Sequence, residues 1–170
     1  MAQSGNHPAA SSPEQLWAEC GVRRLRRSGP GGQNRNKVET AISLHHLSTG
    51  VRAEASERRS QAQNRSVALF RLRTNLALEV RRACGPDCQP SSLWQSRSHG
   101  GLKISASHED FPTLLAEALD VLAALDFEPK PAAAVLRCTP SQLLRLLKLE
   151  PRALALVNGW RGQRGLHSLR

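Results

Sequence analysis

Arg27-Ser28-Gly29-Pro30-Gly31-Gly32-Gln33-Asn34-Arg35-Asn36-Lys37 is the stretch of this chain that says most about its fold. Glycine adopts backbone conformations that strain other residues, and proline fixes its own φ. Three glycines and a proline in succession therefore exclude the interior of a helix or strand. The segment is predicted to be an exposed loop with the carboxamide of Gln33 at its tip. A glycine pair is usually only a surface turn between two strands, so the flanking sequence must decide whether this loop is functional.

Two further motifs follow the loop in the sequence. Ala41-Ile42-Ser43-Leu44-His45-His46-Leu47-Ser48-Thr49-Gly50-Val51 has the pattern of a strand that ends in a Thr-Gly turn. Glu57-Arg58-Arg59-Ser60-Gln61-Ala62-Gln63-Asn64-Arg65 contains an Arg-Ser-Gln-x-x-Asn-Arg motif at a helix start. Together the three blocks, over residues 22–76, resemble the peptidyl-tRNA hydrolysis domain of class I peptide chain release factors.

The resemblance implies an α+β fold, with a small mixed sheet packed against one long helix and an all-α C-terminal extension. The organisation predicted along the chain is a disordered leader over 1–13, a domain core over 14–83, and a linker over 84–109 with a possible strand at 102–107. Helices are then expected over 110–170. Ser12, Ser60 and Thr139 are predicted N-caps. The second of these caps a helix to about residue 83, with Leu69, Leu72, Leu76 and Val80 on one face.

The same resemblance implies that the chain hydrolyses the ester of peptidyl-tRNA through Gly31, Gly32 and Gln33. Ester hydrolysis needs a placed water and stabilisation of the developing oxyanion, and no charged base is present in the loop. The main-chain N–H of Gln33 is expected to stabilise the tetrahedral centre, and a methyltransferase is expected to modify its side chain. No cofactor or metal is expected. Arg35 departs from the family, which usually has a hydrophobic residue at this place.

The charge of the chain predicts a polyanionic partner. Its formal net charge is +10, distributed as +8 over residues 1–82, −4 over 83–136 and +6 over 137–170. The expected partners are the large-subunit ribosomal RNA and the P-site peptidyl-tRNA. The residues predicted to contact RNA are Arg26, Arg27, Arg35, Asn36, Lys37, Arg58, Arg59, Ser60, Gln61, Asn64 and Arg65.

Other features indicate the location and state of the protein. Cys20, Cys84, Cys88 and Cys138 lack paired metal-ligand spacing and are predicted to be reduced structural thiols. The sequence has no run long and apolar enough for a membrane span, and its first residues lack the pattern of a secretory signal. The protein is expected to be a cytoplasmic monomer when it is not on the ribosome.

The sequence leaves two hypotheses for how the protein acts. The short sequence before the loop suggests a member without codon-recognition domains, which acts independently of stop codons to rescue stalled ribosomes. The alternative is an inactive RNA-binding module that uses the basic helical C-terminus. Short helices in residues 137–170 fit either a helix-turn-helix or a helical packing module.

Overall fold

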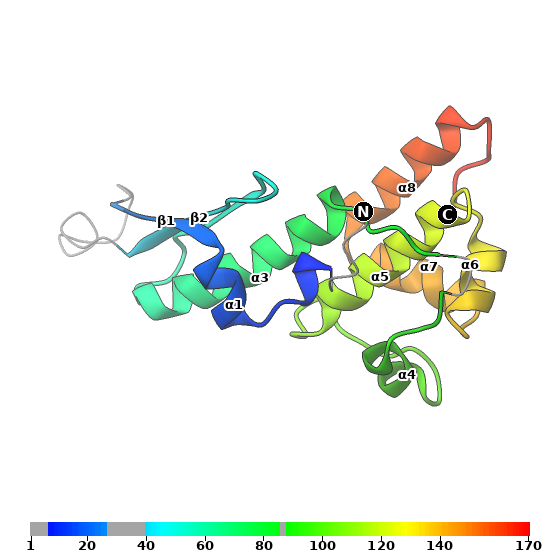
Figure 1. The fold of residues 1–170 in the computed structure, drawn as a ribbon, viewed down its shortest axis with the longest axis horizontal. Helices are drawn as coiled ribbons and strands as arrows, with labels where there is room; N and C mark the ends of the chain where they lie inside the picture. Colours follow the sequence, from blue (N-terminus) through cyan, green and yellow to red (C-terminus); the bar gives the residue numbers. More distant parts are fainter. Residues whose placement is uncertain (1–6, 27–39, 86–87) are drawn as a thin grey trace.

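The computed structural model describes residues 7–26, 40–85 and 88–170. Its first layer is a three-stranded sheet of β1 (Cys20–Leu25), β2 (Ala41–His46) and β3 (Arg52–Ala55), in the order β1-β2-β3 (Figure 1). Both strand pairs are antiparallel. The sequence predicted a mixed sheet, and this part of the prediction is wrong for the described strands. The predicted turn before β3 is present, and Gly50 takes the positive φ of 77° that favours glycine there.

Helix α3 (Gln61–Glu79) is the central element of the molecule and packs against both the sheet and the C-terminal helices. Ser60 is its N-cap, as predicted, and its side chain accepts a hydrogen bond from the backbone N–H of Gln63 at 3.4 Å. The predicted apolar face is buried at Leu69, Leu72 and Leu76. The helix ends four residues before the predicted boundary at 83, because Val80 is already extended.

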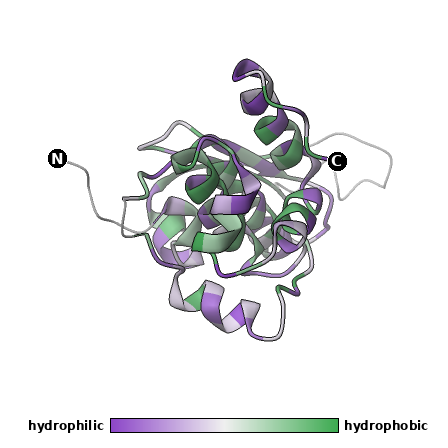
Figure 2. Ribbon diagram, turned by 90° about the vertical axis from the view of Figure 1, so that its right-hand side faces the viewer, coloured by the Kyte–Doolittle hydropathy of each residue, from purple (hydrophilic) through white to green (hydrophobic). Residues whose placement is uncertain are grey.

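The C-terminal extension consists of α5 (Phe111–Ala124), α6 (Pro129–Val135), α7 (Pro140–Lys148) and α8 (Pro151–Gln163). The apolar face of α5 packs along α3, and α6 and α7 pack in turn on α5. Figure 2 shows the hydrophobic residues gathered where these helices meet. The capping box predicted at Thr139 is present, since its side chain and that of Gln142 bond each other's backbone N–H groups. None of the described helices is long and apolar enough to cross a membrane.

Helix α8 continues through Asn158 and Gly159 to Gln163, and the residues after it return along the helix. Arg161 is buried inside the continued helix and donates to the carbonyl of Phe127 at 2.6 Å and to that of His167 at 2.8 Å. Asn158 then exchanges two hydrogen bonds with the backbone of Leu169, at 3.1 and 2.7 Å. These long-range contacts fold the tail back onto α8.

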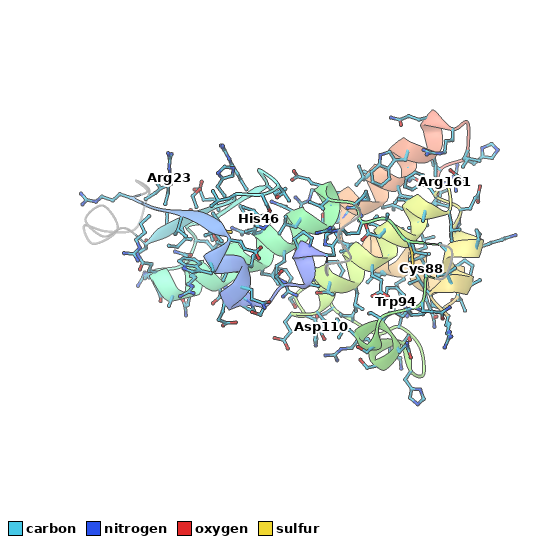
Figure 3. The ribbon with its side chains drawn as sticks, viewed as in Figure 1. Arg23, His46, Cys88, Trp94, Asp110 and Arg161 are labelled. Carbon is cyan, nitrogen blue, oxygen red and sulfur yellow. A yellow bond between two sulfur atoms is a disulfide. The ribbon has the colours of Figure 1, made fainter. Side chains whose placement is uncertain are left out.

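The predicted linker over 84–109 contains a helix instead of a strand. Helix α4 (Ser92–Ser98) buries Trp94, whose indole N–H donates to the carbonyl of Leu136 at 2.7 Å. Residues 102–107 form no strand in the described structure. Figure 3 shows Trp94 on the side of the molecule where α4 lies. The helix is therefore held by a hydrogen bond to a residue 42 positions away.

The expectation of four reduced thiols is wrong for one pair. Cys84 and Cys88 form a disulfide, with their Cα atoms 5.6 Å apart. The other two cysteines are free, and burial raises the pKa of each thiol to about 11. Cys20 and Cys138 are therefore protonated at neutral pH, as expected of structural thiols.

The leader predicted over 1–13 is ordered from residue 7 in the described structure. Residues Pro8–Ala10 form the short helix η1, and Ala9 is fully buried. Arg73 from α3 donates to the carbonyl of Ala9 at 2.8 Å. The next helix, α1 (Pro13–Ala18), begins with the predicted cap at Ser12. The leader is ordered because it packs between α3 and α5, which local composition does not reveal.

The stability of this N-terminal contact is predicted to depend on the pH through His7. Burial lowers the pKa of His7 from 6.5 to about 4, and its neutral ring donates to the carbonyl of Val80 and accepts from the N–H of Ala9. The unfolded chain binds a proton more readily, so this contribution is present at pH 7 and is lost as pH falls from 6.5 towards 4. The expected loss at pH 5 is about 2 kcal/mol.

The measurement compares urea unfolding of the native chain and His7→Gln at pH 7 and pH 5. The comparison is needed because burial also raises the pKa of Asp120 to about 6. This carboxyl makes both proteins more stable as pH falls, which is opposite to the effect of His7. The native chain should lose about 2 kcal/mol more than the variant. An equal loss in both would contradict the role of His7.

Candidate functional site

The described residues on either side of the 27–39 segment are held beside each other by the sheet. Strand β1 ends at Leu25 and β2 begins at Ala41, and these two residues are paired in the antiparallel register. The segment therefore connects adjacent strands at one end of the sheet. The predicted site residues Arg27, Gly31, Gly32, Gln33, Arg35, Asn36 and Lys37 lie outside the described residues.

Asn64 joins the start of β2 to the turn that precedes α3. Its side-chain N–H₂ donates to the carbonyl of Thr40 at 2.7 Å and to the carbonyl of Arg58 at 2.9 Å. Its side-chain oxygen accepts from the N–H of Arg58 at 2.9 Å. The residue is fully buried. The predicted RNA contact by Asn64 is therefore wrong, because its amide is enclosed and engaged by the protein's own backbone.

Four of the cations predicted to contact RNA lie among the described residues and are exposed. Arg26 follows β1, Arg58 and Arg59 lie in the turn before α3, and Arg65 lies in the first turns of that helix. Ser60 is exposed and caps α3, while Gln61 is half-buried. The structure thus brings together cations from three separate parts of the sequence. The N-terminal end of α3, beside them, adds the partial positive charge of a helix start.

Arg65 is held against an aromatic ring. Its guanidinium carbon lies 4.0 Å from the centre of the Trp17 ring, at the end of α1. Trp17 was expected from the sequence to dock on the domain, but its contact with a predicted RNA-binding arginine was not. Beside this pair is a hollow of ≈ 170 Å³ lined by residues of α1, β1, β2 and α3, namely Trp17, Arg24, Ile42, Gln61, Ala62 and Arg65.

The two strand histidines have separate environments. His46 is buried, and its ring nitrogens lie 2.7 Å from the Thr49 hydroxyl and 3.1 Å from a Glu19 carboxylate oxygen. It therefore ties the hairpin turn to the end of α1, which is a structural role. His45 is half-buried on the opposite face of β2.

The chemistry offered by the described part of this site is electrostatic. Among the described residues, no group of three His, Cys, Asp or Glu side chains is arranged to hold a metal ion. What the described residues provide is a set of exposed guanidinium groups beside a helix N-terminus. Such an arrangement can bind a polyanion.

Comparison with known proteins identifies this unit. Residues 17–98 match the profile of the RF-1 domain. These residues form an RF-1 domain. The match includes the sheet, α3 and α4, and thus every described residue of the site just given.

Several peptide chain release factors are similar in sequence to part of this chain. The chloroplastic peptide chain release factor PrfB1 of Arabidopsis thaliana is 51% identical over 51 residues, which are 30% of this chain and 11% of that protein. Peptide chain release factor 1 of Streptococcus thermophilus is 48% identical over 50 residues, 29% of this chain and 14% of that protein. Peptide chain release factor 1 of Chlorobaculum tepidum is 49% identical over 52 residues, which are 31% of this chain and 15% of that protein. The matched segments thus span a small part of each relative.

Sequence reasoning missed two residues that shape the RF-1 domain site. Thr40 was not singled out, although its carbonyl accepts the hydrogen bond that fixes the start of β2. Arg24 was grouped with its neighbours, although its pairing with Ile42 places it on the α3 side of the sheet. Strand alternation carried a signal for Arg24, whereas a backbone acceptor such as Thr40 leaves no mark in a sequence.

Replacement of Asn64 by alanine is predicted to destabilise the RF-1 domain by about 2–3 kcal/mol, because three backbone groups lose their partner in a buried place. Gln63→Ala is the matched control, because Gln63 precedes Asn64 in the same helical turn and its side chain is exposed. Urea unfolding of both variants measures the difference. Equal stabilities would contradict the role given to Asn64.

Proposed function

We propose that this protein hydrolyses the ester bond of peptidyl-tRNA on the ribosome through Gly31, Gly32 and Gln33. The single observation that carries the proposal is the RF-1 domain match over residues 17–98, which contains this tripeptide between β1 and β2. The relatives that share this region are named peptide chain release factors. The antiparallel pairing of Leu25 with Ala41 gives the tripeptide a fixed base.

The proposed chemistry needs little from the loop beyond shape and one amide. Gly31 and Gly32 let the backbone approach closely to an RNA-walled centre, where a side chain would be an obstacle. The main-chain N–H of Gln33 donates to the oxygen that becomes negative as water attacks the ester carbonyl. A neutral donor stabilises that charge without needing to be deprotonated. The carboxamide side chain excludes nucleophiles larger than water.

The same proposal assigns RNA binding to the cations near the loop. Arg26, Arg58 and Arg59 are exposed and would contact phosphates of the ribosomal RNA, with Arg27, Arg35, Asn36 and Lys37 contributing from the loop itself. Ser60, Gln61 and Arg65 extend this surface along the start of α3. Asn64 supports the surface from inside the domain, since it fixes the backbone of Arg58.

We further propose that release is independent of stop codons, that Gln33 is methylated on its side-chain amide, and that a cytoplasmic monomer carries out the rescue of stalled ribosomes. The support for codon independence is that the described residues after the RF-1 match are packed as a helical extension. Helices α5 to α8 cover α3 and one another, so their apolar faces serve the core of this protein.

The alternative, an inactive module that binds RNA through the helical C-terminus, is less well supported by the contacts. Arg161 is buried, Arg145 donates to the carbonyl of Leu102, and Arg152 pairs with Glu150. Arg137 bonds Gln89, and Arg164 lies 3.6 Å from an Asp126 carboxylate oxygen. Most cations of this region therefore have partners inside the protein. This use of charge favours the helical packing module over the helix-turn-helix.

Peptide release from ribosomes tests the proposal directly. Ribosome complexes that carry labelled peptidyl-tRNA are incubated with the protein, with a stop codon, a sense codon or an empty A site. The native protein should release peptide in all three, whereas Gln33→Ala and Gly32→Ala should lower the rate at least about 100-fold, the scale of losing one oxyanion donor. Binding should persist in both variants. Release at the native rate by Gln33→Ala would contradict the catalytic assignment.

Ribosome binding at increasing salt tests the phosphate contacts. Arg58→Ala and Arg59→Ala should each weaken binding and reduce the slope of log K against log salt by about one, because each removes one phosphate contact. Lys130→Ala is the control, since Lys130 is exposed in α6, at the other end of the molecule from β1 and β2 (Figure 1). Slopes unchanged in the two arginine variants would count against this surface.

A further inference from the structure

The hollow beside Trp17 is lined by residues of α1, of strands β1 and β2, and of the start of α3. Arg24 is paired with Ile42, and directly paired residues on antiparallel strands project to the same face. Arg24 therefore lies on the α3 side of the sheet, together with the buried side chain of Ile42. Its neighbour Arg23 pairs with Ser43 and lies on the opposite face. Figure 3 shows Arg23 at the end of the sheet away from Arg161.

The hollow combines an apolar floor with two cations. Ile42 and Ala62 line it, and Arg24 and Arg65 are both exposed beside them. Within the described residues, neither guanidinium forms an ion pair with a carboxylate. One side of the Arg65 guanidinium lies against Trp17, at 4.0 Å from the ring centre. This contact packs Arg65 against Trp17 beside the hollow, where its guanidinium presents a planar cation.

These features fit one particular kind of ligand. A volume of ≈ 170 Å³ is below the roughly 300–1,000 Å³ of sites that enclose a whole small molecule, so the hollow accepts a single group. Unpaired RNA bases stack on aromatic rings and on arginine guanidinium planes, and their backbone phosphates pair with arginines. A phosphate alone would gain nothing from the apolar floor. An apolar side chain alone would gain nothing from two unpaired guanidinium groups.

We propose that this hollow binds one unpaired nucleobase of RNA, stacked on the Trp17–Arg65 pair, with its adjoining phosphate on Arg24. The inference rests on the proposed function only for the identity of the RNA as ribosomal. It adds base recognition to a surface otherwise expected to contact phosphates alone. The site is separate from the tripeptide, so it contributes to placing the domain on RNA and not to ester hydrolysis.

The test uses two probes with equal numbers of phosphates, a five-nucleotide adenosine RNA and a ribose-phosphate chain of the same length without bases. Fluorescence anisotropy measures their binding to the full chain. The native protein should bind the adenosine RNA at least about five-fold more tightly, the lower end of what stacking of one base contributes. Arg65→Lys keeps the charge but loses the flat group, so it should bind both probes alike.

Arg23→Lys is the matched control, because it makes the same substitution on the opposite face of the same sheet and should retain the preference for bases. Arg24→Ala should weaken both probes by a similar factor, since it removes only a phosphate contact. Equal binding of the two probes by the native chain, or an undiminished preference in Arg65→Lys, would overturn the inference.

The probes contain no ribosome, which separates this result from that of the release assay. A protein that prefers the base-containing probe but releases no peptide would contradict the proposed function and leave the base site in place. A protein that releases peptide but does not prefer the base-containing probe would support the proposed function and contradict the base site. Adenosine monophosphate should compete only weakly, and competition as strong as that of the RNA would assign the hollow to a free nucleotide instead.

Discussion

The organisation of the candidate site depends on the buried amide of Asn64. Three hydrogen bonds from this one side chain connect the start of β2, the turn before α3 and α3 itself. A buried amide without such partners would be costly, so its engagement fixes all three backbone segments together. The junction thus holds Thr40, the described residue that adjoins the 27–39 segment, to the turn that carries Arg58.

Helix α3 carries that junction into the rest of the protein. One flank covers the sheet, and another packs along α5. Arg73 adds hydrogen bonds to the carbonyl of Ala9 and to the hydroxyl of Thr113, at 2.8 and 2.9 Å. The extension is therefore joined to the RF-1 domain through one shared helix and a buried polar network, so the two share one hydrophobic core.

The distribution of charge follows the same division. Near the sheet end of α3, the guanidinium groups of Arg58, Arg59 and Arg65 are exposed. Elsewhere, buried or half-buried arginines serve the fold: Arg161 in the extension bonds two carbonyls, and Arg81, just after α3, pairs with Asp120 of α5 at 3.3 Å. A basic composition therefore has two physical meanings in one chain. Exposure and pairing, which composition does not contain, separate exposed charge from charge that serves the fold.

The sequence by itself determined the features that depend on residues close together. The caps at Ser12, Ser60 and Thr139, the turn at Gly50 and the apolar face of α3 are confirmed, because each is set by contacts within a few residues. The α+β class and the RF-1 domain also follow from ordered local motifs. Tertiary structure alone decided the burial of Asn64, the helix around Trp94, the folded tail and the ordered leader. Each of these depends on a partner distant in sequence, as the bond from Trp94 to Leu136 does, and a pattern of neighbours does not reveal which distant groups will meet.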